Sequence, residues 1–153
     1  MPGYSGTPLP KKLGIKPAYR VQFVNLPAEV LAELSPALSD CRILKQGDDL
    51  DFVMLFTKSR SELTKEFSRM AKLLAPAGML WVSWPKQSSG VETNVDEKAV
   101  RDIGLIAGLV DVKVCAVTEV WSGLKFVRRA GSRSQRRKIA GEKSQRESDL
   151  RRA

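Results

Sequence analysis

The hydrophobic pattern of the middle of the chain predicts a strand, a helix and a second strand in succession. One apolar run occupies residues 52–57, and a second occupies residues 79–84. Both runs are apolar on two faces, which is typical of parallel strands that are covered by helices on both sides. Between them, apolar residues recur at spacings of four, three and four, as on one face of a helix. These residues are Leu63, Phe67, Met70 and Leu74. The stretch therefore predicts a right-handed βαβ unit.

Polar residues beside these runs predict where the helix begins and ends. Ser59 and Glu62 have the spacing of a capping box, in which the hydroxyl and the carboxylate each accept a backbone N–H at the start of a helix. Pro76 and Gly78 are expected to end the same helix before the second strand.

A further helix and a hairpin are predicted in the second half of the chain. Asn94 and Glu97 resemble a helix start. The buried face of that helix is expected to consist of Val100, Ile103, Ala107 and Val110. Residues 111–120 and 124–128 read as two strands that are joined by a short turn at residues 121–123.

The first third of the chain adds two strands and one helix. Residues 20–25 and 41–45 are the strand candidates, and Pro27 suits the first turn of the helix between them. The apolar face of this helix is predicted to carry Val30, Leu31, Leu34 and Leu38. The predicted order is β-α-β-β-α-β-α-β-β. This order defines an α/β fold of Rossmann-like type, with a mostly parallel sheet that closes in an antiparallel hairpin.

Composition and charge divide the chain into three parts. The chain has 153 residues with 42% hydrophobic content, which is enough for one domain. Residues 1–16 read as an irregular arm that leads into a short helical turn, residues 17–128 as the α/β domain, and residues 129–153 as a basic tail. From Arg128 to the end, ten Lys and Arg face three acidic residues, so most of the net charge of +9 lies there.

The tail is expected to be disordered, because Ile139 and Leu150 are its only large apolar residues. Its cations could contact nucleic acid phosphates in a salt-dependent manner, or it could serve only to keep the protein soluble. No aromatic residue in the tail could stack on bases, which favours the second interpretation.

The absence of histidine from the sequence narrows the possible chemistry. It excludes a Ser-His-Asp or Cys-His nucleophile and the usual zinc sites. Cys41 and Cys115 lie in apolar, strand-like segments, where a thiol ordinarily packs as a small hydrophobic group. We therefore expect no metal, no cofactor and no disulfide. No apolar run has the length of a signal peptide or a membrane span, so the protein is expected to be soluble and cytoplasmic, without membrane contact.

Several motifs resemble known families. The segments LGIKPAYRVQFVN, ELTKEFSRMAKLLAPAGMLWVS and the terminal hairpin are similar to parts of class I S-adenosylmethionine-dependent methyltransferases. The segments GYSGTPLPKKLGIK, WPKQSSG and KVCAVTEVWSGLKFV resemble an actinobacterial family known as domain of unknown function 3052. The resemblance covers about residues 2–128. It implies a methyltransferase-like fold and no assigned reaction.

The sequence departs from the methyltransferase pattern at the turn after its first strand. Such sheets carry glycines there, which let the backbone approach the cofactor, and an acidic residue after the second strand to hold the ribose. This chain has Val24, Asn25, Leu26 and Pro27 at that turn. Asp48 or Asp49 could act as the ribose carboxylate, but beside a glycine they more often form a turn. The segment before residue 52 is also short for the usual second and third βα units.

The candidate site lies where the predicted parallel strands end. Ligands of such sheets bind beyond the carboxyl ends of the strands, where helix N-termini add positive partial charge. The polar residues expected there form an anion-binding edge, and the alternative is a set of solvated loops that cap helices. These residues are Lys58, Arg60, Lys86, Ser88 and Ser89.

Aromatic residues give two further predictions. Trp81 and Trp84 are three apart in a strand, so they should face opposite sides of the sheet and pack in its cores. Trp121 is expected at a hairpin tip, where it could contact a ligand or partner or pack on the arm that carries Tyr4. Tyr4 itself could be a site residue or could simply dock the terminus.

The sequence therefore favours a non-catalytic binding or regulatory protein with a small anionic ligand or a protein partner. A divergent S-adenosylmethionine-dependent methyltransferase is the main alternative. Nucleic-acid association through the tail is a third.

Overall fold

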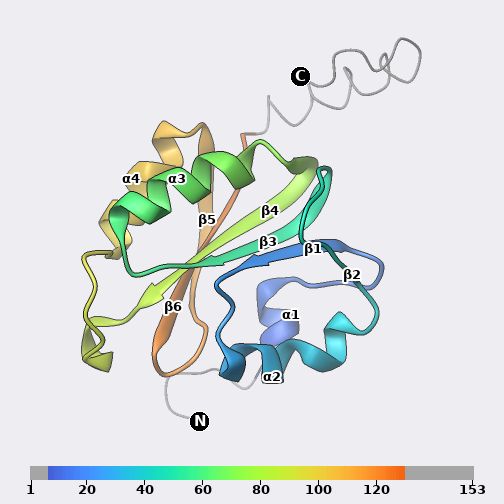
Figure 1. Cartoon of the computed structure of the whole chain (residues 1–153), viewed down its shortest axis with the longest axis horizontal. Helices are drawn as coiled ribbons and strands as arrows, with labels where there is room; N and C mark the ends of the chain where they lie inside the picture. Colours follow the sequence, from blue (N-terminus) through green and yellow to red (C-terminus); the bar gives the residue numbers. More distant parts are fainter. Residues whose placement is uncertain (1–6, 130–153) are drawn as a thin grey trace.

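Six strands form one sheet within residues 7–129, which are the residues that this computed structural model describes. The strands are β1 (Arg20–Val24), β2 (Arg42–Ile43), β3 (Leu50–Phe56), β4 (Leu74–Pro85), β5 (Leu109–Ala116) and β6 (Trp121–Arg128). Their order across the sheet is β2-β1-β3-β4-β6-β5 (Figure 1). The first four strands are parallel, and β6 is antiparallel to both of its neighbours.

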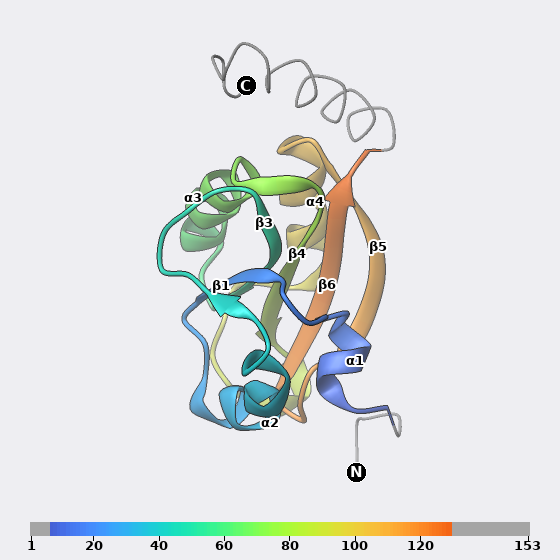
Figure 2. The ribbon, with the colours of Figure 1, turned by 90° about the vertical axis from the view of Figure 1, so that its right-hand side faces the viewer.

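Helices cover both faces of the sheet. In the described part of the chain they are α1 (Leu9–Leu13), α2 (Ala28–Leu38), α3 (Arg60–Ala71), the 3-10 turn η1 (Gln87–Ser89) and α4 (Glu97–Ile106). The buried residues of α1 and α2 share one hydrophobic core with one face of the sheet, and those of α3 and α4 share a second core with the other face. Figure 2 shows α3 and α2 on either side of β1 and β2.

This architecture confirms the predicted fold class and the predicted order of strands and helices. Trp81 and Trp84 do face opposite cores. The indole Nε1 of Trp81 donates a hydrogen bond to the carbonyl oxygen of Leu13 at 2.9 Å, so α1 is tied to the centre of the sheet. Tyr4 and residues 130–153 of the predicted tail lie outside the described residues.

The predicted end of α3 is wrong. The helix ends at Ala71, and Leu74 already pairs with Leu50 in the sheet. The strand β4 continues through Pro76 and Gly78, where the pairing with β3 is irregular and proline is tolerated. A side chain on Gly78 would lie 2.4 Å from the carbonyl oxygen of Leu50. Gly78 therefore permits close approach of two backbones and does not terminate the helix.

The predicted start of α4 is also wrong by two residues. Asp96 caps this helix, because its carboxylate accepts the backbone N–H of Ala99 at 2.9 Å. Of the predicted buried face only Val100 is fully buried, Ile103 and Val110 are half-buried, and Ala107 is exposed. Gly104 takes the central place in the face, because the Phe126 ring lies directly against it.

Two apolar residues lie elsewhere than predicted. Leu31 is 44% exposed on α2 and is not part of the core. Trp121 is not at a hairpin tip, because residues 121–123 belong to β6 and the turn lies at residues 117–120. The hydroxyl of Thr118 accepts the backbone N–H groups of Val120 and Trp121 and thereby shapes the turn. The Trp121 ring is buried edge-on against Phe56, with 5.2 Å between ring centroids.

None of the helices within residues 7–129 has the length and apolar content needed to cross a bilayer.

Candidate functional site

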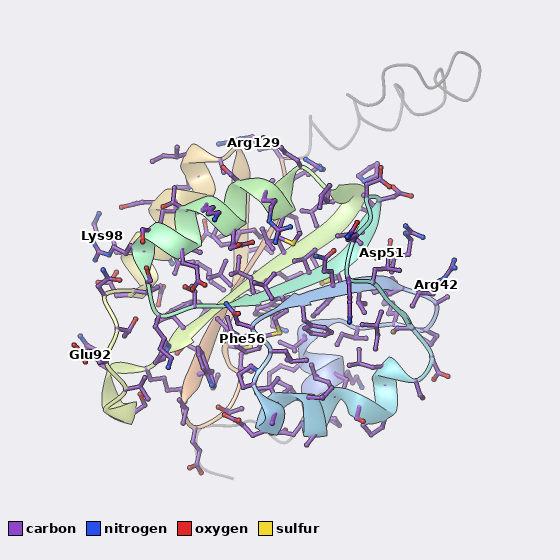
Figure 3. The ribbon with its side chains drawn as sticks, in the orientation of Figure 1. Arg42, Asp51, Phe56, Glu92, Lys98 and Arg129 are labelled. Carbon is purple, nitrogen blue, oxygen red and sulfur yellow. The ribbon has the colours of Figure 1, made fainter. Side chains whose placement is uncertain are left out.

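The carboxyl ends of β1, β3 and β4 lie at one edge of the sheet (Figure 1). The chain leaves β1 toward α2 on one face and leaves β3 toward α3 on the other. The point between β1 and β3 is therefore the topological switch point, where open α/β sheets form a ligand crevice. In Figure 3, Phe56 at the end of β3 marks this edge.

Side chains of the protein itself bridge this crevice. Asn25 follows β1 in a left-handed conformation, with φ of 58°. Its amide nitrogen donates to the carbonyl oxygen of Phe56 at 3.1 Å and to the carboxylate of Glu62 at 3.2 Å. The hydroxyl of Thr57 donates to the other oxygen of Glu62 at 2.6 Å. We call Asn25, Thr57 and Glu62 the crevice bridge.

The crevice bridge changes the interpretation of the predicted capping box. Ser59 does cap α3, since its hydroxyl accepts the backbone N–H of Glu62 at 3.3 Å. The carboxylate of Glu62, however, bonds to Asn25 and Thr57, and the backbone N–H of Ser59 bonds to the Thr57 hydroxyl at 3.2 Å. Half of the capping box is therefore confirmed, and the other half is replaced by a contact across the sheet.

Arg60 ties the start of α3 to the loop that precedes α4. Its backbone N–H donates to the side-chain oxygen of Asn94 at 2.9 Å, and its guanidinium Nε donates to the Asn94 carbonyl. Its Nη2 lies 3.9 Å from the carboxylate of Asp96. This explains why Asn94, predicted as a cap of its own helix, caps the neighbouring one. Lys58 is exposed, while its carbonyl accepts the hydroxyl of Thr93 at 2.8 Å.

The loop after β4 holds the other predicted site residues. Lys86 is half-buried, and its backbone N–H donates to the Val120 carbonyl at 2.8 Å. The Ser89 hydroxyl donates to the Lys86 carbonyl at 2.6 Å and accepts from the backbone N–H of Val91 at 3.1 Å. Ser88 is exposed. Ser89 is therefore engaged in closing its own loop, whereas no hydrogen bond or ion pair within residues 7–129 engages the side chains of Lys86 and Ser88.

The structure places Asp48 and Asp49 at the opposite edge, near the start of β3. The guanidinium of Arg20, at the start of β1, donates to the Asp48 carbonyl at 3.1 Å through Nη2. Asp49 adopts a left-handed φ of 56°. These residues form a turn beside the starts of β1 and β3, opposite the carboxyl end of β1, so they are not placed to act as a ribose carboxylate.

A lysine cluster beside Cys115 was not predicted from the sequence. The Lys12 ammonium donates to the Ala116 carbonyl at 3.0 Å, and the Lys113 ammonium donates to the Lys12 carbonyl at 3.0 Å. Burial lowers the pKa of Lys125, and the charges of Lys113 and Lys16 lower it further. The only sequence signal of this cluster is the alternation of polar positions in β5 and β6. Lys12 of α1 also belongs to the cluster, although it lies 101 residues before Lys113 in the chain.

Neither described cysteine has the environment of a nucleophile. Burial raises the pKa of the Cys115 thiol, against the opposing effect of Lys12 and Lys113. Burial also raises the pKa of Cys41. Within residues 7–129, no group of three or more Cys, Asp or Glu side chains is placed to hold a metal ion.

The sheet order defines a Rossmann-like domain, and this fold is shared with solved structures of S-adenosylmethionine-dependent methyltransferases. Magnesium protoporphyrin IX methyltransferase from Synechocystis PCC 6803, solved with bound SAH, is similar at 12% identity and a TM-score of 0.53, over 79% of this chain and 78% of that one. A SAM-dependent methyltransferase from Aquifex aeolicus is similar at 15% identity and a TM-score of 0.52, over 76% of this chain and 85% of that one. At such identities the likeness concerns the fold.

The chain belongs to the family described as "Protein of unknown function (DUF3052)", whose model matches residues 11–130. This confirms the resemblance that the sequence motifs indicated. A comparison with curated proteins found no match.

Proposed function

We propose that this protein is a non-catalytic binding or regulatory module with a methyltransferase fold. The observation that carries the proposal is the crevice bridge. Asn25, Thr57 and Glu62 satisfy one another across the switch point, where the fold would otherwise leave a ligand crevice. A ligand at this position would have to break these hydrogen bonds and displace a carboxylate.

The turn after β1 supports the same proposal. Leu26 and Pro27 are half-buried side chains at a turn where a cofactor needs bare backbone. Proline also lacks a backbone N–H, so this turn offers one hydrogen-bond donor fewer to an anionic or hydroxylated ligand.

The neighbouring edge offers cations that could hold a small anion. The ammonium groups of Lys58 and Lys86 have no carboxylate partner among the described residues. Arg60 contacts Asp96 only at 3.9 Å. We propose that these three cations, with the hydroxyl of Ser88, bind a phosphate or carboxylate group at this edge. The predicted role of Ser89 is then to hold the loop that carries Lys86 and Ser88, because its hydroxyl donates to the Lys86 carbonyl. Tyr4 and Trp121 as further contacts of this ligand remain predictions.

Titration calorimetry with S-adenosylmethionine and with SAH tests the first part of the proposal. We expect no binding heat at millimolar ligand, because the crevice bridge occupies the position. Magnesium protoporphyrin IX methyltransferase, which has been solved with SAM, serves as the positive control. The fold likeness supports the alternative of a divergent methyltransferase, and saturable binding that disappears on Asn25→Trp would refute the filled crevice and favour that alternative.

Titration with pyrophosphate and citrate tests the anion edge. We expect Lys86→Ala and Lys58→Ala each to weaken binding by about tenfold, the effect of losing one charge-assisted contact. Lys65→Ala is the matched control, because Lys65 is an exposed lysine of α3 outside this edge. Absence of binding, or equal weakening by Lys65→Ala, would refute the anion edge and leave the crevice argument unaffected.

A further inference from the structure

A groove lies on the α3 side of β1, at the end of the sheet where β2 is the edge strand. Two adjacent hollows of about 540 Å³ and 770 Å³ share Gln22, Lys45 and Arg69 in their walls. Val24 and Leu44 add apolar surface to the smaller hollow, and Leu73 adds it to the larger one. We call this the β1 groove. Figure 2 shows β1 and β2 in front, with α3 on one side of them.

Gln22 lies at the floor of the β1 groove because of the alternation of strand residues. Val21 on one side of it faces the core under α1 and α2, and Val24 two residues further on packs against the core under α3 and α4. Gln22 pairs in register with Val53 of β3, so it faces the same side as Val24.

The side-chain oxygen of Gln22 is buried without a partner among residues 7–129. The side chain is 4% exposed, and its Oε1 has no hydrogen-bond partner among the described residues. Turning the amide by 180° would only exchange an unpaired acceptor for an unpaired donor. A buried amide without a partner costs free energy, and such groups are rare in folded proteins. A molecule in the groove would supply the missing hydrogen bond.

The walls of the groove carry positive charge. Arg69 bonds to the carboxylate of Glu66 through Nε and Nη2, which leaves its remaining N–H groups for another acceptor. No carboxylate pairs with Lys45 in the described part of the chain. The groove thus combines a primary amide, apolar walls and two cations, with Asp48 as an acidic residue in the wall of the larger hollow.

We infer that the β1 groove binds a small planar ligand that has a hydrogen-bonding edge and an anionic group. A primary amide donates and accepts side by side, so it pairs with a planar edge that does the same, such as a heterocyclic base or a carboxamide. The apolar side chains contact the faces of the ring, and Arg69 and Lys45 bind the anionic group. The inference does not depend on the proposed anion edge, because the two sites share no residue.

Nuclear magnetic resonance of the full chain tests this inference, with uridine and adenosine 5′-monophosphates as probes. The side-chain NH₂ signals of Gln22 are identified by their absence from the spectrum of Gln22→Leu. We expect either nucleotide to shift these signals in a saturable manner, and uridine or inorganic phosphate alone to bind at least tenfold more weakly.

Variants separate this site from a nonspecific effect. Gln22→Leu and Arg69→Ala are each expected to weaken nucleotide binding at least tenfold, while Lys65→Ala on the same helix leaves it unchanged. Gln22→Leu should melt at or above the temperature of the parent, since it removes an unpaired buried amide, and this shows that the variant is folded.

Three results would overturn the inference. The first is that neither nucleotide binds saturably at millimolar concentration. The second is that a nucleotide binds but does not shift the Gln22 signals. The third is that phosphate alone binds as tightly as the nucleotides. If Lys86→Ala weakens nucleotide binding and Arg69→Ala does not, the nucleotide binds at the anion edge and not in the β1 groove.

Discussion

Replacing Asn25 tests whether the crevice bridge stabilises the fold. Asn25→Gly removes the hydrogen bonds to the Phe56 carbonyl and the Glu62 carboxylate but suits the left-handed backbone, with its φ of 58°. A neutral hydrogen bond contributes about 0.5–1.5 kcal/mol, and the more exposed bond to Glu62 contributes about 0.5 kcal/mol. We therefore expect Asn25→Gly to lower the free energy of unfolding by about 1–2 kcal/mol.

Asn25→Ala separates the side-chain bonds from the backbone conformation. Alanine loses the same two bonds and must also adopt a left-handed conformation, which costs about 1–2 kcal/mol for a residue with a Cβ atom. The alanine variant should therefore be less stable than the glycine variant by about 1 kcal/mol. Urea unfolding, followed by tryptophan fluorescence, measures both differences, because they exceed the error of the method.

A double-mutant cycle with Glu62→Ala measures the coupling between the two residues. We expect a coupling energy of about 0.5 kcal/mol or more, because the two side chains are in direct contact. If Asn25→Gly unfolds at the same urea concentration as the parent and only Asn25→Ala is destabilised, the bridge contributes nothing, and the argument for a filled crevice fails. Asn25→Gly should still not bind S-adenosylmethionine, since Leu26 and Pro27 remain in the turn.

Three further predictions concern other parts of the fold. Gly104→Ala should destabilise the protein by about 1–3 kcal/mol through overpacking, because its Cβ would lie 2.0 Å from the Phe126 ring, and Phe126→Leu should recover part of this loss in a urea-unfolding cycle. Lys125, whose pKa is lowered in the folded state, destabilises the fold when charged, so its contribution to stability should improve as pH rises through the folded pKa toward the ordinary value of 10.5. Lys113→Met should raise the Lys125 pKa in an NMR titration, and an unchanged value would refute the proximity of the two charges. Ser59→Ala should cost about 1 kcal/mol in thermal unfolding through loss of its bond to the Glu62 N–H, and no loss would show that this bond does not stabilise the start of α3.

The sequence predicts those features that depend on local periodicity. The stripe of Leu63, Phe67 and Met70 defines α3, and the alternation of Trp81 and Trp84 defines the two faces of β4, because one face of each element is fully buried. These signals also fix the order of elements and hence the fold class. They contain no information on which distant residue satisfies a polar side chain.

The features that the sequence does not reveal depend on contacts between distant segments. Asn94 caps α3 because the loop before α4 passes its N-terminus, and no local pattern records this proximity. Gly78 breaks a helix in most contexts, yet here it admits the backbone of β3. The partnership of Asn25 with Glu62 likewise requires β1 and β3 to be neighbours, which follows only from the strand order.

The short connection between β1 and β3 explains why the β1 groove is open. After α2, the chain forms only the two-residue strand β2 and returns to β3 through residues 44–49, so no described helix covers the α3 side of β1 at that end. Proteins commonly place charged side chains on an uncovered edge strand, where they prevent pairing with another chain. Arg42 and Lys45 are exposed and fit this explanation. Gln22 does not, because it is buried and its Oε1 has no hydrogen-bond partner in the described part of the chain, so it does not solvate this end of the sheet. A ligand that pairs with the amide accounts for both the polarity and the burial of this residue.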